Sequence, residues 1–236
     1  MRTFPYKKIL FLNIAGAILF FSYAWSGLDG PWARLDEKIF RFFNHLIAEN
    51  PFLREVIAVS NLRMFDVIIL LSMGAIYGWY FARGNAPYRR NLICIGLVML
   101  LSAVVLKVGA QKIMLFEHPS PTLYFEGVHR LSELSALSPK DAAGNSFPGD
   151  HGLMLLVFAG FAARYLGGTA FILALLVAVI FSLPRVAAGA HWSSDILVGS
   201  VGYSLLMLPW LLLTPLSDKL AGFFDRILPK WLFSGS

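Results

Sequence analysis

Charged residues are scarce in this chain of 236 residues, since Lys, Arg, Asp and Glu together make up only 14% of it. A soluble domain carries about 25% charged residues, so this chain has too few to cover a surface exposed to water. Hydrophobic residues make up 57% and the mean hydropathy is +0.66. Several apolar runs reach about 18 residues, enough to cross a hydrocarbon core. The sequence therefore predicts an all-α integral membrane protein.

Three further absences narrow the classes of protein. Cys94 is the one cysteine, which excludes an internal disulfide. No small-residue cleavage motif follows the first apolar run, which favours a retained span over a cleaved signal peptide. No aromatic-basic nucleic-acid motif is present, so the net charge of +6 indicates anionic lipid headgroups as partners and no nucleic acid.

Apolar segments take up most of the chain, so we expect a single domain over residues 1–236. Six transmembrane helices are predicted, at 9–25, 65–81, 92–110, 152–165, 169–183 and 195–213. Between the first two, apolar residues from Leu35 to Ile47 recur at helical spacing, with Asp36 and Asn44 among the polar positions. This pattern predicts an outer-face amphipathic helix, which either lies in the membrane interface or packs on the outer end of the bundle.

An even number of spans puts both termini on one side of the membrane. Basic residues dominate both terminal segments, the loop 83–90 and the turn at Arg164, and the only acids there are Asp218 and Asp225. The positive-inside rule assigns these segments to the cytoplasm. The other side carries twelve of the fourteen acidic residues. The polar segments 111–118, 148–151 and 185–195 also fall on that outer side, which predicts a single site there.

Four polar residues at these span ends suit phosphoryl transfer. His191 and Asp195 are four apart, so on a helix they share a face, and the carboxylate can accept the Nδ1 proton and leave Nε2 as a nucleophile. His151 follows a Pro-Gly turn at a predicted helix start, where it can protonate a leaving oxygen. Arg185 offers a planar fork for two phosphate oxygens.

Two other interpretations compete with this chemistry. Two histidines and two aspartates could hold a divalent ion, although Arg185 among them would repel a cation and the spacing fits no common zinc pattern. Alternatively, the four residues form a polar network in a lipid transporter or a structural membrane protein, which would tolerate His191→Ala. Burying four such groups without a use is expensive, so we favour chemistry without a metal or other cofactor.

Two motifs carry a resemblance to a known family. Pro148-x-x-His151 and Arg185-x5-His191-x3-Asp195 resemble the second and third signatures of the type 2 phosphatidic acid phosphatase superfamily. The resemblance implies a six-span helical bundle, a phosphohistidine intermediate and catalysis without a metal. It also implies that His191 is the nucleophile, Asp195 its orienting acid, His151 the general acid and Arg185 a phosphate clamp.

Other signature positions depart from the superfamily pattern. The first signature, Lys-x6-Arg-Pro, is replaced by Gln111-x6-His118-Pro119, and Gly149-Asp150 stands where the second signature has Ser-Gly. The expected contacts to the substrate phosphate therefore include Gln111, His118, Gly149 and Asp150 beside Arg185.

Lysines near these positions could restore the missing charge. Lys107 or Lys112 is the candidate for the lysine and arginine absent from the first signature. Asp150 either orients an acceptor or pairs with Lys112 or Lys140. The loop 120–145 is long enough to cover the site, and its apolar residues Val128, Leu131, Leu134 and Leu137 could form a helix face that dips into the headgroups.

The departures point to a subfamily. The segments 120–123, 146–152, 189–192 and 213–218 resemble enzymes of the Gram-negative inner membrane that move the distal phosphate of undecaprenyl diphosphate to the 1-phosphate of lipid A on the periplasmic face. The resemblance implies these two lipids as substrates and a small inhibitory membrane peptide as a partner. The alternative is a membrane lipid phosphatase that hydrolyses undecaprenyl diphosphate or a phospholipid and releases inorganic phosphate.

Overall fold

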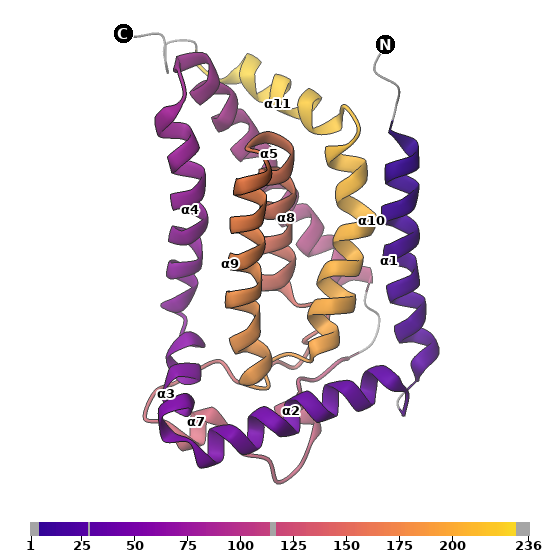
Figure 1. Ribbon diagram of the computed structural model, residues 1–236, viewed down its shortest axis with the longest axis vertical. Coiled ribbons are helices and arrows are strands. Elements are labelled where there is room, and N and C mark those ends of the chain that lie inside the picture. The colour runs from indigo at the N-terminus through magenta and orange to yellow at the C-terminus, as the bar shows by residue number, and fades with distance from the viewer. Residues whose placement is uncertain (1–4, 28, 114–116, 230–236) are drawn as a thin grey trace.

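The computed structural model describes residues 5–27, 29–113 and 117–229. An upright bundle contains α1 (Tyr6–Ser26), α4 (Phe65–Arg83), α5 (Ala86–Ile113), α8 (Asp150–Tyr165), α9 (Gly168–Ala187) and the continuous pair η1 (Asp195–Ser200) and α10 (Val201–Leu212) (Figure 1). Outside it lie α2 (Pro31–Glu49), α3 (Pro51–Ser60), α6 (Pro121–Tyr124), α7 (Leu131–Leu134) and α11 (Leu216–Ile227). The described part of the chain contains no strand, in agreement with the all-α prediction.

Five helices of the described residues are long and apolar enough to cross a membrane: α1, α4, α5, α9 and the η1–α10 pair. They correspond to five of the six predicted spans. The sixth, α8, has 16 residues, about 24 Å at 1.5 Å per residue. It lies among the other helices (Figure 1), and Leu153, Val157, Phe158 and Phe161 on it are buried. Because protein surrounds α8, its length does not have to match the hydrocarbon thickness.

The first and last spans are joined through polar groups inside the bundle. Proline lacks an N–H, so Pro209 within α10 leaves the carbonyl of Leu205 without its helical donor. The side chain of Asn13 on α1 donates to that carbonyl at 2.9 Å. The two helices also pack closely at Gly16 of α1, where a Cβ would lie 2.9 Å from the carbonyl oxygen of Gly202 on α10. The amide of Asn13 thus compensates for the proline and holds α1 against α10.

The segment 27–64 is mostly helical, and α2 lies across one end of the bundle (Figure 1), in contact with α1, α3 and α9. Of the two alternatives for this helix, packing on the bundle end is the one observed. Its inner face buries Phe40 and Ile47 together with Asp36 and Asn44, which the sequence pattern had assigned to the polar face. That assignment was wrong because both polar side chains bind loop groups, Asn44 through the backbone of His129 and Asp36 as described below.

The loop 120–145 also packs on protein. Leu131 is fully buried against Ile47 and Ile57, and Leu137 packs on the same cluster. The predicted helix face in the headgroups was therefore wrong, because α7 has only four residues and turns Leu131 inward. At the opposite end of the bundle, α11 is held by ion pairs of Asp218 and Asp225 with arginines of α8 and α5. The start of α1 lies at that same end (Figure 1), as an even number of spans requires.

Candidate active site

His191 follows the end of α9 in a tight turn. Gly189 in this turn has φ of +72°, and a Cβ there would lie 2.7 Å from the ring of Phe40, so glycine is required. The turn brings Nδ1 of His191 to 2.9 Å from the carbonyl oxygen of Ser146 and 3.2 Å from Oδ2 of Asp195. Both partners only accept, so Nδ1 carries the proton and Nε2 keeps its lone pair.

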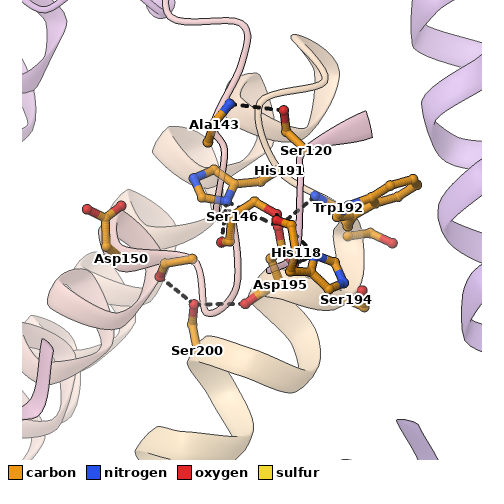
Figure 2. A network of polar contacts seen from close by, with 12 residues as sticks. His118, Ser120, Ala143, Ser146, Asp150, His191, Trp192, Ser194, Asp195 and Ser200 are labelled. Carbon is orange, nitrogen blue, oxygen red and sulfur yellow. Dashed lines mark hydrogen bonds and ion pairs between the residues drawn. The ribbon is translucent and has the colours of Figure 1, made fainter. Parts of the chain in front are cut away.

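Asp195 lies next to His191, but not across a helix face as the spacing of four suggested. The residues before Ser193 form a turn, and the π-helix η1 begins at Asp195 itself. Its Oδ2 also accepts the backbone N–H of Trp192 at 2.9 Å, and the residue is fully buried. Figure 2 shows His191 facing Ser146, with Asp195 and His118 close by. The carboxylate thus closes the turn and contacts the imidazole at the same time.

Asp36 of α2 binds two of the three residues between His191 and Asp195. Its carboxylate accepts the hydroxyls of Ser193 and Ser194, both at 2.5 Å, and the backbone N–H of Ser194 at 2.9 Å. Burial raises the pKa of Asp36 above its usual range, and the hydrogen bonds from the two serines oppose that shift. The helix at the end of the bundle is thereby fixed to the turn that carries His191.

His151 is the second residue of α8, as predicted. Its Nδ1 lies 2.8 Å from Oδ1 of Asp150, and its Nε2 lies 3.2 Å from Oδ1 of Asp66. Asp150 also accepts the backbone N–H of His151 at 2.8 Å and pairs with Lys107 at 2.9 Å. The predicted pairing of Asp150 with Lys112 or Lys140 was therefore wrong, because α5 packs on α8 at the position of Lys107.

Arg185 lies in the last turn of α9, with its side chain only 4% exposed. Its Nη2 lies 2.7 Å from Oδ1 of Asp66 and 3.4 Å from Nε2 of His151. Its Nη1 donates to Oδ1 of Asn61 at 3.4 Å. The guanidinium and the His151 imidazole are therefore neighbours, and both contact the same carboxylate oxygen.

These side chains surround a cavity of about 310 Å³. Five predicted site residues line it, namely Gln111, Asp150, His151, Arg185 and His191. Lys140 from the loop 120–145 lines it too. Two imidazoles and two cations therefore line one volume that is large enough for a phosphate or diphosphate group.

His118 is placed elsewhere. Its Nε2 lies 2.8 Å from the hydroxyl of Tyr23, and its Nδ1 lies 3.2 Å from Oγ of Ser146 and 3.8 Å from Oδ1 of Asp195. It lines a second cavity of about 470 Å³ between α1, α2 and the segment 117–125. The geometry thus puts His118 behind the His191–Asp195 pair and gives no support to its predicted contact with phosphate.

Gly149 is the N-cap of α8 and is not among the residues that line the cavity beside His191. Its N–H donates to the carbonyl of Asp195 at 3.1 Å, and its carbonyl accepts the hydroxyl of Ser200 at 2.7 Å. A Cβ at this position would lie 2.4 Å from Cδ1 of Ile196. A side chain at position 149 would therefore require the terminal methyl group of Ile196 to move.

A metal ion is the competing occupant of the cavity. Ligand atoms of Asp150, His151 and His191 all lie within 4.8 Å of one another, a spacing that a metal could use. Lys107 already pairs with Asp150, and Arg185 lies 3.4 Å from Nε2 of His151. Two cations in contact with two of the three ligands disfavour a divalent ion and favour an anion.

Sequence reasoning missed Asp66, Asn61 and Asp36 as parts of the site. Asp66 is a single acid at the start of an apolar run, and Asn61 lies in a segment that was read as a loop. No spacing rule connects them to partners that lie far away in the sequence, such as His151, which is 85 positions from Asp66. The one available signal was that a carboxylate next to a membrane span is energetically unfavourable unless a cation or a hydrogen-bond donor lies close to it.

A family model and two known proteins are similar to this chain. Residues 91–216 match the family model of the PAP2 superfamily. The chain is 47% identical over 222 residues to a protein of Escherichia coli (strain K12) named lipid A 1-diphosphate synthase, and the match covers 94% of each chain. The crystal structure of a transmembrane PAP2-type phosphatidylglycerolphosphate phosphatase from Bacillus subtilis gives a TM-score of 0.47 at 20% identity, covering 94% of this chain and 98% of that one. With more than half of its length matched by the family model, the chain belongs to the PAP2 superfamily.

Proposed function

We propose that this protein transfers the distal phosphate of undecaprenyl diphosphate to the 1-phosphate of lipid A, giving undecaprenyl phosphate and lipid A 1-diphosphate. The observation that carries the proposal is the cavity in which His191, His151 and Arg185 meet. The identity of 47% to the Escherichia coli lipid A 1-diphosphate synthase supports the choice of the two lipids.

The first step forms a phosphohistidine. Nε2 of His191 attacks the distal phosphorus while Arg185 and Lys140 neutralise its oxygens, and the bond to the bridging oxygen breaks. His151 gives a proton to that oxygen, so undecaprenyl phosphate leaves. The phosphorylated imidazole retains its Nδ1 proton, shared between the Ser146 carbonyl and Asp195, and is therefore a cation beside a carboxylate.

The second step transfers the phosphoryl group to the acceptor. An oxygen of the lipid A 1-phosphate attacks the phosphorus, and the bond from phosphorus to Nε2 breaks, which regenerates neutral His191. The proton of the acceptor phosphate passes to the imidazole of His151 and restores the general acid. No metal takes part, since Arg185, Lys107 and Lys140 supply the positive charge. Water must be kept from the phosphohistidine, and the loop 120–145, which reaches the cavity through Lys140, is suited to cover it.

The orientation follows from charge. We place the cavity on the periplasmic face of a Gram-negative inner membrane and both termini in the cytoplasm, because the loop 83–90 and Arg164 are basic and lie at the end of the bundle opposite the cavity. The whole chain acts as one domain in this proposal. Control by a small membrane peptide stays a prediction of the resemblance.

The test follows the label. Purified protein in detergent receives undecaprenyl diphosphate labelled on its distal phosphate, together with lipid A. We expect the label on lipid A, its loss in His191→Ala, and its retention in His45→Ala, a control that removes an exposed histidine of α2. Label released as inorganic phosphate in the presence of lipid A would make the protein a phosphatase and refute the transferase.

A further inference from the structure

Asp66, in the first turn of α4, contacts three cationic or protonatable groups of the cavity wall. Its carboxylate lies 2.7 Å from Arg185, 3.2 Å from Nε2 of His151 and 3.6 Å from Nζ of Lys140. All three partners line the cavity, whereas Asp66 is not among its lining residues in the part of the chain that the structure describes. The carboxylate therefore stands behind the wall and binds the groups that form it.

Arg185 depends on this contact. Its guanidinium is almost completely buried, and an unpaired buried cation is strongly unfavourable. Asp66 neutralises it from one side through Nη2, while Asn61 accepts from Nη1. The planar group is thus held in one orientation, with its other side lining the cavity.

His151 is held from both sides. Asp150 faces its Nδ1 and Asp66 faces its Nε2. Both contacts are hydrogen bonds only when both nitrogens carry protons. In the proposed first step the bridging oxygen of the substrate therefore replaces Asp66 as the acceptor of the Nε2 proton. Asp150 belongs to α8 itself, so Asp66 is the contact that fixes the imidazole relative to Arg185.

Asn61 extends the arrangement to the loop 120–145. It is fully buried, and its side chain donates to the carbonyls of Ile57 and Pro184 at 2.8 and 2.9 Å. The backbone carbonyl of Asn61 accepts the backbone N–H of Lys140 at 2.9 Å. The turn before α4 thereby joins α9 to the loop at the residue whose ammonium group faces Asp66.

We propose that Asp66 is a positioning residue for phosphoryl transfer, which holds Arg185, His151 and Lys140 in one geometry around the substrate phosphate. The proposal rests on the proposed function. Asp66 would orient His151 and Arg185 in the way that Asp195 orients His191. The proposal predicts that Asp66 acts in part through His151, so its removal costs less once His151 is gone, although Arg185 and Lys140 still lose their contact.

The experiment is a double-mutant cycle on phosphoenzyme formation. Asp66→Asn, His151→Ala and the double variant are mixed with undecaprenyl diphosphate labelled on its distal phosphate, without lipid A, and label bound to protein is followed in a single turnover. We expect Asp66→Asn to slow labelling about 100-fold in the wild-type background and at least about tenfold less in the His151→Ala background. The matched control is Asp218→Asn, which removes an aspartate paired with Arg164 at the opposite end of the bundle and should leave the rate unchanged.

Equal slowing in both backgrounds, or no slowing, would overturn the proposal, since a general loss of structure is independent of His151. If Asp66→Asn does not fold, Asp66→Glu decides, because it keeps the charge for Arg185 and moves the carboxylate by one methylene. Slowing with the same dependence on His151 supports positioning, and a wild-type rate refutes it. Failure of the transferase is distinguishable, since a wild-type protein that is labelled but passes phosphate to water leaves the Asp66 measurement intact.

Discussion

Asp195→Asn separates two effects of the acid beside the nucleophile. In a Ser-His-Asp triad the same exchange puts the imidazole in the wrong tautomer and lowers the rate about 10⁴-fold. Here one carboxylate oxygen, Oδ2, accepts from both His191 and Trp192. The other oxygen, Oδ1, has no hydrogen-bond partner in the described structure and lies 3.8 Å from His118. An asparagine can therefore present its carbonyl oxygen to His191 and its amide group toward His118.

The expected loss is consequently that of the charge alone. Ser146 keeps accepting from Nδ1 at 2.9 Å, so the tautomer is preserved. The phosphorylated imidazole is a cation, and a unit charge about 4 Å away contributes about 4 kcal/mol at an effective dielectric constant of about 20. At 1.36 kcal/mol per factor of ten, phosphoenzyme formation should slow about 10³-fold.

The assay is single-turnover labelling of the protein from undecaprenyl diphosphate, with folding checked by size-exclusion chromatography and thermal unfolding in detergent. Ser146 contributes through its backbone, so no side-chain change at that position removes the second acceptor. Asp195→Ala is the companion variant, and it also removes the acceptor for the N–H of Trp192. Slowing of 10⁵-fold or more in folded Asp195→Asn would show that Ser146 does not hold the tautomer. Slowing below tenfold would show that no cationic phosphohistidine forms.

Three further outcomes follow from the geometry. Gly149→Ser places a Cβ 2.4 Å from Cδ1 of Ile196 and should destabilise the protein by about 1–3 kcal/mol in thermal unfolding; Ile196→Ala should relieve the loss, and an unchanged melting temperature in Gly149→Ser would contradict the close approach. EDTA should leave phosphoenzyme formation unchanged, whereas loss of labelling that Mg²⁺ or Zn²⁺ restores would establish a metal at Asp150, His151 and His191. Burial raises the pKa of Asp36, so the folded protein retains this proton to higher pH than the unfolded chain. Stability should therefore fall as pH rises from the ordinary carboxyl range through the raised pKa. Asp36→Asn should flatten that part of a plot of melting temperature against pH, and an unaltered plot would refute the assignment.

The spans were predictable because lipid imposes a simple rule of length and apolarity. The predicted segments 9–25, 65–81 and 169–183 fall within α1, α4 and α9. The predicted span 152–165 also falls within α8, whose 16 residues are surrounded by protein. For α2, the apolar spacing suggested the wrong inner face. Burial of Asp36 depends on two serines more than 150 residues away, which no local pattern contains.

The site was predictable where chemistry follows chain spacing and topology. His191, Asp195, His151 and Arg185 meet as expected, because span ends on one side converge. The broken first signature was misleading in part, since Gln111 lines the cavity but His118 turns to Tyr23. The contacts of Asp66 depend on where α4 stands relative to α9, which is a property of packing.

The packing of α1 against α10 has a consequence for the order in which the protein assembles in the membrane. Asn13 and the carbonyl of Leu205 are 192 residues apart in sequence. The side chain of Asn13 in the first span can therefore make this hydrogen bond only when the last span is present. The η1 segment that begins at Asp195 leads directly into α10, so the active site is completed at that same late moment. Contacts of such long sequence separation form slowly. The contact between α1 and α10 and the contact between His191 and Asp195 therefore both require the last span to be in place.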